Sequence, residues 1–116
     1  MEYIRSGQNV AIILDSVDLK HNNLKMTYKN VLFSLQRFEN VILDMRKIRF
    51  LDSTVLSLFL LLHQKSCEHG SCLSMRNLRK RIMEILYIHK IDKCIPCLTS
   101  LPAPDYPYGY NNLFLP

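Results

Sequence analysis

The sequence predicts a single α/β domain, built as a mixed β-sheet of about four strands with crossover helices. The first observation is a pair of continuous apolar runs, Val10–Leu14 and Val41–Met45, which are typical of strands covered on both faces. The second is the helical spacing of apolar residues between them, as at Leu24, Tyr28 and Val31. Strands that alternate with helices favour a sheet whose parallel strands are joined by crossovers. A chain of 116 residues can bury one core and is too short for two domains.

Two elements flank the first interior strand. Tyr3–Ser6 is expected to form a short strand that ends at Gly7. A helix is expected over residues 22–37, with Asn22 or Asn23 as its N-cap. Together with the interior strand, they give the order strand, strand, helix for the first third of the chain.

The second interior strand leads into the most hydrophobic helix of the chain. Asp52 and Ser53 offer N-capping groups to a helix over residues 53–69, and Gly70 ends it. Its apolar run, Val55–Leu62, is much shorter than the roughly 20 residues that a membrane-spanning helix needs. We therefore predict a helix of the protein core and no insertion into a membrane.

The last third of the chain contains a strand, a helix and a change of composition. Cys72–Met75 is short and strand-like, and apolar residues at helical spacing predict a third helix over residues 77–89. All five prolines lie between Pro96 and the end of the chain, together with three of the six tyrosines. Because proline cannot continue a helix, residues 101–116 are expected to be an extended tail, and residues 1–100 the folded domain.

Charge and composition exclude several classes of protein. The net charge is +5, but the basic residues are dispersed, there is no tryptophan and no known nucleic-acid-binding motif appears, so we expect no nucleic-acid partner. No apolar run follows the first residues, as a secretory signal would require. Four cysteines without such a signal indicate reduced thiols. The expected location is the cytoplasm.

The cysteines and histidines include candidate ligands for a metal and a candidate redox pair. Cys67, His69 and Cys72 surround a predicted turn, and Cys94 and Cys97 form a C-x-x-C pair. The ligand types suit zinc, but the spacings match no zinc finger or ribbon, and a redox pair belongs at a helix start that follows a strand. No nucleophile–base pattern or phosphate-binding loop is present. We therefore expect no metal, no cofactor and no enzymatic activity.

One segment resembles a known family. Residues 41–57 read VILDMRKIRFLDSTVLS: an apolar strand that ends in Asp-Met, a short linker, and an Asp-Ser-Thr group at a helix start. This pattern resembles the signature of the STAS domain, which anti-sigma factor antagonists and sulfate transporters share. The resemblance extends over roughly residues 8–95, with Gly70 and Cys72–Met75 matching the glycine and strand that follow in the family. Two family glycines are replaced, one by Val55 and one by Lys90.

The resemblance implies a STAS-like fold and a regulatory protein–protein interaction module. It implies phosphorylation at Thr54, with Ser53 as the neighbouring candidate, and an anti-sigma factor or regulatory kinase as partner. Two alternatives from the same family remain open: a subunit that docks on the ATPase of an ABC-type lipid transporter, and a soluble STAS domain of a sulfate transporter. A homodimer also remains open.

The residues themselves suggest where a partner would bind. At 100° per residue, Leu61 falls on the polar side of its helix near Ser57, with Leu58 at the margin, so Leu61 is an exposed apolar side chain close to Thr54. In an α/β layout, loops at the carboxyl ends of the strands meet at one edge of the sheet. The residues predicted to bind a partner at this edge or along this helix are Asp15, Asp18, Asp52, Ser57, Leu58, Leu61, Arg76 and Arg79.

Overall fold

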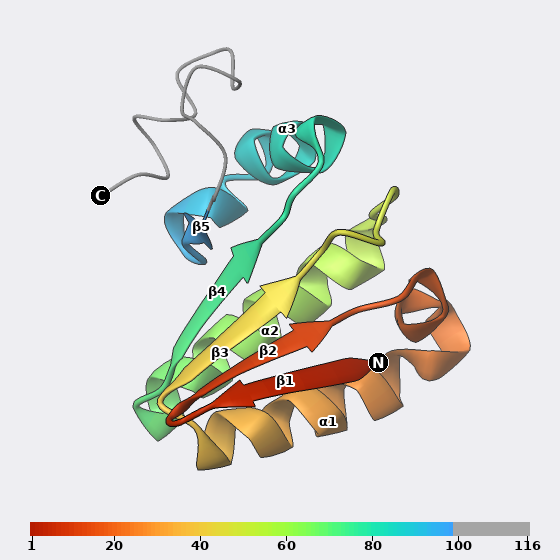
Figure 1. Ribbon diagram of the computed structural model, residues 1–116. Helices are drawn as coiled ribbons and strands as arrows, with labels where there is room; N and C mark the ends of the chain where they lie inside the picture. The colour runs from red at the N-terminus through yellow and green to blue at the C-terminus, as the bar shows by residue number, and fades with distance from the viewer. Residues whose placement is uncertain (99–116) are drawn as a thin grey trace.

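A computed structural model of the protein, which describes residues 1–98, contains one five-stranded sheet with three α-helices. The chain runs in the order β1 (Glu2–Ser6), β2 (Asn9–Ile13), α1 (Leu24–Arg37), β3 (Asn40–Asp44), α2 (Ser53–His69), β4 (Cys72–Arg76), α3 (Lys80–Ile88) and β5 (Cys97–Leu98). Short 3-10 turns lie at Ser16–Leu19, His21–Asn23 and Ile91–Lys93. The sheet keeps the order of the sequence, β1-β2-β3-β4-β5 (Figure 1).

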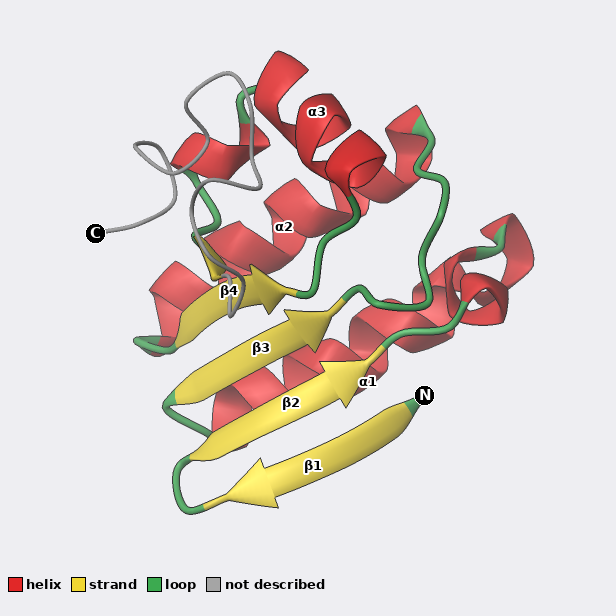
Figure 2. Cartoon of the chain, turned by 45° about the horizontal axis from the view of Figure 1, so that its top comes forward, coloured by secondary structure: helices red, strands yellow, loops and turns green. Residues whose placement is uncertain are grey.

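The first pair of strands is an antiparallel hairpin and the remaining pairs are parallel. Gly7 lies at φ +60° in the two-residue turn between β1 and β2, which is the backbone shape that such a turn requires at its first position. The parallel pairs β2–β3 and β3–β4 are joined by α1 and α2, which cover the same face of the sheet (Figure 2). The expected α/β mixed sheet is confirmed.

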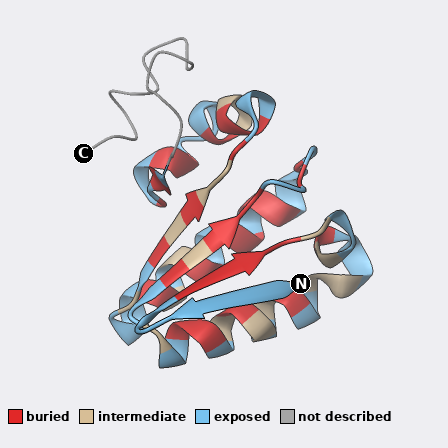
Figure 3. Ribbon diagram, viewed as in Figure 1, coloured by how far each residue is buried: buried red, intermediate tan, exposed pale blue. Residues whose placement is uncertain are grey.

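The core lies between the sheet and these two helices. Alternate residues of the interior strands, such as Val10 and Ile12 of β2 or Val41 and Leu43 of β3, are almost fully buried on this side. They pack in one cluster with Phe59 and other apolar residues of α2. Burial is highest in β2, β3 and the inner faces of the helices, whereas β1 is exposed along its whole length (Figure 3).

The ends of α2 agree with the sequence prediction. The side chain of Asp52 accepts a hydrogen bond from the backbone N–H of Val55 at 2.9 Å, so Asp52 is the N-cap. Gly70 ends the helix at φ +71°, in the left-handed conformation that suits glycine. Ser53 is the first residue of the helix and does not cap it.

The starts of two helices and the number of strands differ from the prediction. The first helix begins at Leu24 because His21–Asn23 forms a 3-10 turn, and the third begins at Lys80 because Asn77 adopts a left-handed φ of +56°. The sheet has a fifth strand, Cys97–Leu98, where we expected only an exit segment after the third helix. Cys97 pairs with Met75 of β4, so this strand depends on a tertiary contact and has no pattern of its own. The predicted tail, residues 101–116, lies outside the described part of the chain.

None of the helices in residues 1–98 combines the length and apolar character needed to cross a membrane.

Candidate functional site

The start of α2 presents two adjacent exposed hydroxyl groups, those of Ser53 and Thr54. Thr54 is the second residue of the helix and is exposed. Two other polar side chains nearby are occupied: Asp52 caps the helix, and Ser57 Oγ donates a hydrogen bond to the Ser53 carbonyl at 3.1 Å. Within residues 1–98 neither of the two hydroxyl groups, of Ser53 and Thr54, has a hydrogen-bond partner. Both belong to the first turn of α2, at the positive end of the helix dipole, a setting that favours a bound negative charge.

Thr54 stands at the rim of a groove between α1 and α2. The groove has a volume of about 290 Å³. Its lining residues come from both helices and are Leu24, Lys25, Tyr28, Thr54, Ser57, Leu58 and Leu61. We call this feature the α1–α2 groove. It brings together four residues that the sequence predicted for phosphorylation or partner binding.

The leucines of the groove differ in exposure. Leu61 is 40% exposed, as its place on the polar side of the helix predicted. Leu58 is only 9% exposed and belongs to the core, so it offers an edge of its side chain to the groove. Val55, which replaces a family glycine, is buried in the core, and its branched side chain does not line the α1–α2 groove beside Thr54.

A network of charges at the carboxyl ends of β3 and β4 escaped the sequence analysis. Asp44, the last residue of β3, is fully buried. Its Oδ2 accepts hydrogen bonds from Arg46 Nη2 at 2.7 Å, Arg76 Nε at 2.9 Å and Asn77 Nδ2 at 2.9 Å. Its Oδ1 accepts from Arg46 Nε at 3.0 Å and from the Arg46 backbone N–H at 3.1 Å. This carboxylate ties the loops before α2 and α3 to the sheet.

The electrostatics of Asp44 follow from this arrangement. Burial by itself raises the pKa of a carboxyl group, because it disfavours the charged form. Here the hydrogen bonds from Arg46, Arg76 and Asn77 outweigh burial and hold the pKa of Asp44 well below its usual range. The group is therefore a carboxylate at every physiological pH.

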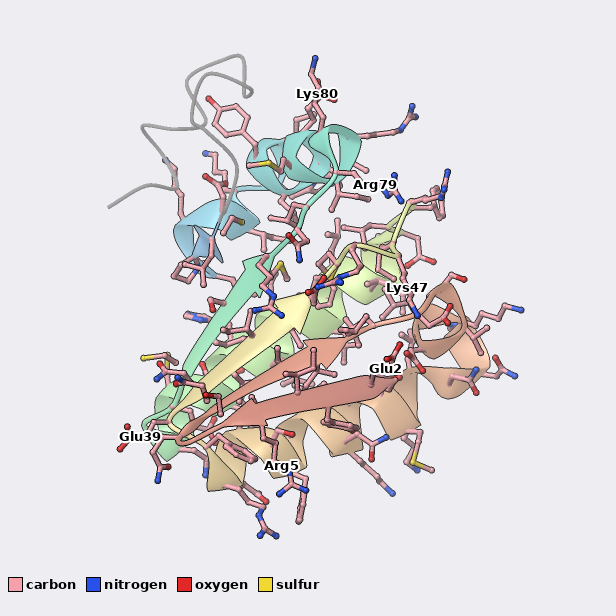
Figure 4. The ribbon with its side chains drawn as sticks, viewed as in Figure 1. Glu2, Arg5, Glu39, Lys47, Arg79 and Lys80 are labelled. Atoms are coloured by element: carbon pink, nitrogen blue, oxygen red, sulfur yellow. The ribbon has the colours of Figure 1, made fainter. Side chains whose placement is uncertain are left out.

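The predicted arginines lie at this edge and have structural contacts there. Arg76 stands opposite Asp44 in the sheet register and pairs with it. Arg79 precedes α3 and donates from Nη2 to the Arg46 carbonyl at 3.1 Å. Figure 4 shows Arg79 and Lys80 at the end of the molecule beyond β4, and Lys47 at the same edge closer to β1. These side chains therefore lie at the expected edge, outside the α1–α2 groove.

The predicted aspartates after β2 also have local contacts. The Asp15 backbone N–H donates to Asp18 Oδ2 at 2.8 Å, and Thr27 of α1 donates from Oγ1 to the Asp18 carbonyl at 2.7 Å. Hydrogen bonds from the backbone of Val17 and Ser16 lower the pKa of Asp15. Asp15 and Asp18 thus fix the turn that leads into α1 and belong to neither wall of the groove.

A second, more basic groove adjoins the start of α2. It has a volume of about 410 Å³ and is lined by Ser16, Leu19, Lys20, His21, Lys47, Ile48, Arg49, Phe50, Asp52 and Val55. Phe50 is 73% exposed, unusually high for an aromatic residue. The sequence alone does not separate it from Ile48 and Leu51 of the same loop, which are buried in the core.

The cysteines do not gather into one site. All four are unbonded; Cys67, Cys72 and Cys94 are exposed, and Cys97 is buried. Burial raises the pKa of the Cys97 thiol to about 12. Among residues 1–98, no group of three or more His, Cys, Asp or Glu side chains is placed to hold a metal ion.

The structure is a small α/β domain with a groove between α1 and α2. The chain belongs to the STAS domain family, whose sequence model matches residues 7–102. Comparison with curated protein sequences gives no match.

Solved structures share this fold. An anti-sigma-factor antagonist (STAS) domain protein from Planctomyces limnophilus superimposes with a TM-score of 0.72 at 16% identity, over 90% of this chain and 92% of that one. The unphosphorylated anti-sigma factor antagonist SpoIIAA gives 0.69 at 13% identity, over 85% and 88%. The phosphorylated form of the Bacillus cell fate determinant SpoIIAA gives 0.62 at 13% identity, over 90% and 96%. At these identities the likeness concerns the fold.

Proposed function

We propose that this protein is a regulatory interaction module of the anti-sigma factor antagonist kind. Its partner is an anti-sigma factor or regulatory kinase that docks on the α1–α2 groove in the cytoplasm, and phosphorylation of Thr54 controls the docking. The observation that carries the proposal is the exposed, unbonded Thr54 hydroxyl, which, unlike that of Ser53, lines a groove of mainly apolar side chains with Leu61 exposed. The fold shared with two forms of SpoIIAA, one of them phosphorylated, supports it.

The physical basis of the switch is charge. A kinase would transfer the γ-phosphoryl group of ATP to Thr54 Oγ1, with loss of the hydroxyl proton and release of ADP. The product adds about −1.5 to −2 charges at the first turn of α2, where the helix end favours them. A partner that packs apolar or acidic groups into the groove would then have to desolvate the phosphate, so binding weakens.

The test begins with the partner, captured on the wild-type chain from its own cells and identified by mass spectrometry. Binding is then measured with wild type, Thr54→Ala and Thr54→Glu. We expect Thr54→Ala to bind like the unmodified wild type and to resist loss of binding when kinase and ATP are added. Thr54→Glu should bind about tenfold more weakly or worse, because one negative charge partly replaces the phosphate.

Ser53→Ala is the matched control. Ser53 is the adjacent hydroxyl, but Asp52 caps the helix, so its loss should change neither stability nor binding by more than a small amount. Equal affinity for all four proteins, together with protein that is never modified at Thr54 in cells, would overturn the switch. Capture of an ABC-type ATPase or a sulfate permease instead would replace the proposed partner.

A further inference from the structure

In the part of the chain that the structure describes, β1 is an edge strand with a neighbour on one side only. Within residues 1–98, β1 pairs only with β2, and all five of its residues are exposed. Tyr3 and Ile4 are large side chains about half exposed on its two faces. An exposed edge strand of this kind offers unpaired backbone groups to another strand. We propose that β1 pairs antiparallel with β1 of a second copy of this chain, which makes a symmetric dimer with a continuous sheet.

The hairpin register fixes which backbone groups face outward. The two-residue turn makes Ser6 and Asn9 the closing pair, whose N–H and C=O groups point at each other. Hydrogen-bonded and non-hydrogen-bonded pairs alternate along an antiparallel ladder. The backbone N–H and C=O groups of Ile4 therefore point toward Ala11 of β2, and those of Tyr3 and Arg5 point toward the open edge. The free edge thus carries two donors and two acceptors, on residues two positions apart.

These groups are complementary to themselves. In an antiparallel pair with a two-fold axis at Ile4, Tyr3 of one copy stands opposite Arg5 of the other, twice. Both are then hydrogen-bonded pairs, which gives four backbone hydrogen bonds across the edge. An axis at Arg5 would set two arginines directly opposite each other, and an axis at Tyr3 would leave Arg5 without a partner strand. The axis at Ile4 is therefore the register that the strand favours.

The side chains fit the same register. Tyr3 and Arg5 lie on the helix side of the sheet, where they line a groove of about 340 Å³ with Phe33 and Arg37 of α1. Phe33 is 56% exposed, and the Arg37 guanidinium stacks over its ring at 5.0 Å. In the dimer each Arg5 stands beside Tyr3 of the other copy, a cation–aromatic pair. On the opposite face, the two exposed Ile4 side chains meet at the axis. Figure 4 shows Arg5 on this outer strand, and Glu2 at its other end near Lys47.

The experiment is sedimentation equilibrium on the full 116-residue chain without any partner, so it is independent of the proposed function. Wild type should shift with concentration from 13.6 kDa to twice that mass. Ile4→Lys should raise the dissociation constant of the dimer at least about tenfold, because two lysines then face each other directly. Ile88→Lys, an equally large change at an exposed isoleucine of α3, is the matched control and should leave the dimer intact.

Two further measurements test the backbone hydrogen bonds across the β1 edge. Arg5→Pro removes an N–H that faces the edge and leaves the ladder to β2 whole, so it should yield a folded monomer. In wild type, hydrogen exchange at the Tyr3 and Arg5 amides should slow as concentration rises, whereas exchange at Ile4 should be slow already. Wild-type protein that stays monomeric at about 0.5 mM, a concentration well above the dissociation constants of specific dimers, would overturn the proposal. So would a dimer that Ile88→Lys disrupts and Ile4→Lys and Arg5→Pro do not.

Discussion

Asp44 is a charged residue whose burial and hydrogen bonds are not evident from its position at the end of an apolar strand. It ends an apolar strand, is fully buried, and is bonded to two arginines and an asparagine. Its partners Arg46 and Arg76 lie partly in solvent, so the network is buried on one side only. A charge held in this way stabilises the fold while its partners are present and leaves them uncompensated when it is removed.

Asp44→Asn should lower the free energy of unfolding by about 2 kcal/mol at neutral pH, less than for a pair buried on both sides. Because folding lowers the pKa of Asp44, its contribution is present above the unfolded pKa of about 4 and is lost as pH falls toward the folded value. The difference between wild type and Asp44→Asn should therefore shrink below about pH 4. Urea unfolding at a series of pH values measures it.

The control for this series is Glu39→Gln, which removes an exposed carboxylate. It should change stability by less than about 0.5 kcal/mol. A difference between wild type and Asp44→Asn that stays constant down to pH 3 would show that Asp44 acts through packing and not through its charge.

Lys90 carries strain that a glycine would relieve. It follows α3 with φ at +60°, and it occupies one of the two positions where the sequence departs from the family glycines. Lys90→Gly should raise the free energy of unfolding by up to about 1 kcal/mol, since the left-handed cost exceeds the extra entropy of glycine in the unfolded chain. Lys90→Ala keeps the Cβ and should bring no gain. Equal melting temperatures for the two variants would contradict this explanation.

At the scale of the element, the faces of α2 have different environments: one contacts solvent, one lines the α1–α2 groove and one packs in the core. Leu60 and Leu61 are similarly exposed, at 44% and 40%, but only Leu61 lines the α1–α2 groove. Leu62 is buried against the sheet. Three consecutive leucines thus face solvent, groove and core, which makes them a matched set of probes.

Leu61→Asp should weaken partner binding at least about tenfold while the melting temperature changes little. Leu60→Asp should leave both unchanged, and Leu62→Asp should destabilise the fold by about 4 kcal/mol or more because it buries a charge. Calorimetry and thermal melting on the same preparations test the set. If Leu61→Asp unfolds the domain as Leu62→Asp does, the groove is not a surface.

The short strand β5 gives a chemical prediction. Cys97 is buried, and its pKa of about 12 keeps the thiol protonated at pH 8. Iodoacetamide should therefore label Cys67, Cys72 and Cys94 in the native protein, and Cys97 only in denaturant. Intact-mass measurement counts the labels. Rapid native labelling at Cys97 would mean that β5 detaches from β4 on the timescale of the reaction.

At the scale of the whole molecule, the sequence predicted elements whose signals are local. The helix at 53–69 was predicted with its observed ends because Asp52 and Gly70 are both local signals. The fifth strand and the Asp44 network could not be predicted in the same way. Both depend on neighbours distant in sequence, Met75 for Cys97 and Arg76 for Asp44, which only the sheet register brings together.

The candidate site likewise has one part that local signals predict and one part that depends on tertiary packing. Helical spacing placed Leu61 beside Thr54, because both belong to one helix. It did not reveal the other wall of the groove, formed by Leu24, Lys25 and Tyr28 of α1, since that wall depends on how two helices pack. The aspartates and arginines were correctly assigned to one edge, but their contacts within the fold were not visible in the sequence.

Within residues 1–98, β1 leaves a margin of five residues, Glu2–Ser6, at one side of the sheet. The proposed pairing uses the same patch on both copies, so the β1 margin of each copy is filled by the other. A contact of this kind closes on itself after two molecules, whereas a contact between two different patches could add copies without limit. Pairing of like with like at this margin therefore gives a finite assembly of two copies and not a fibre.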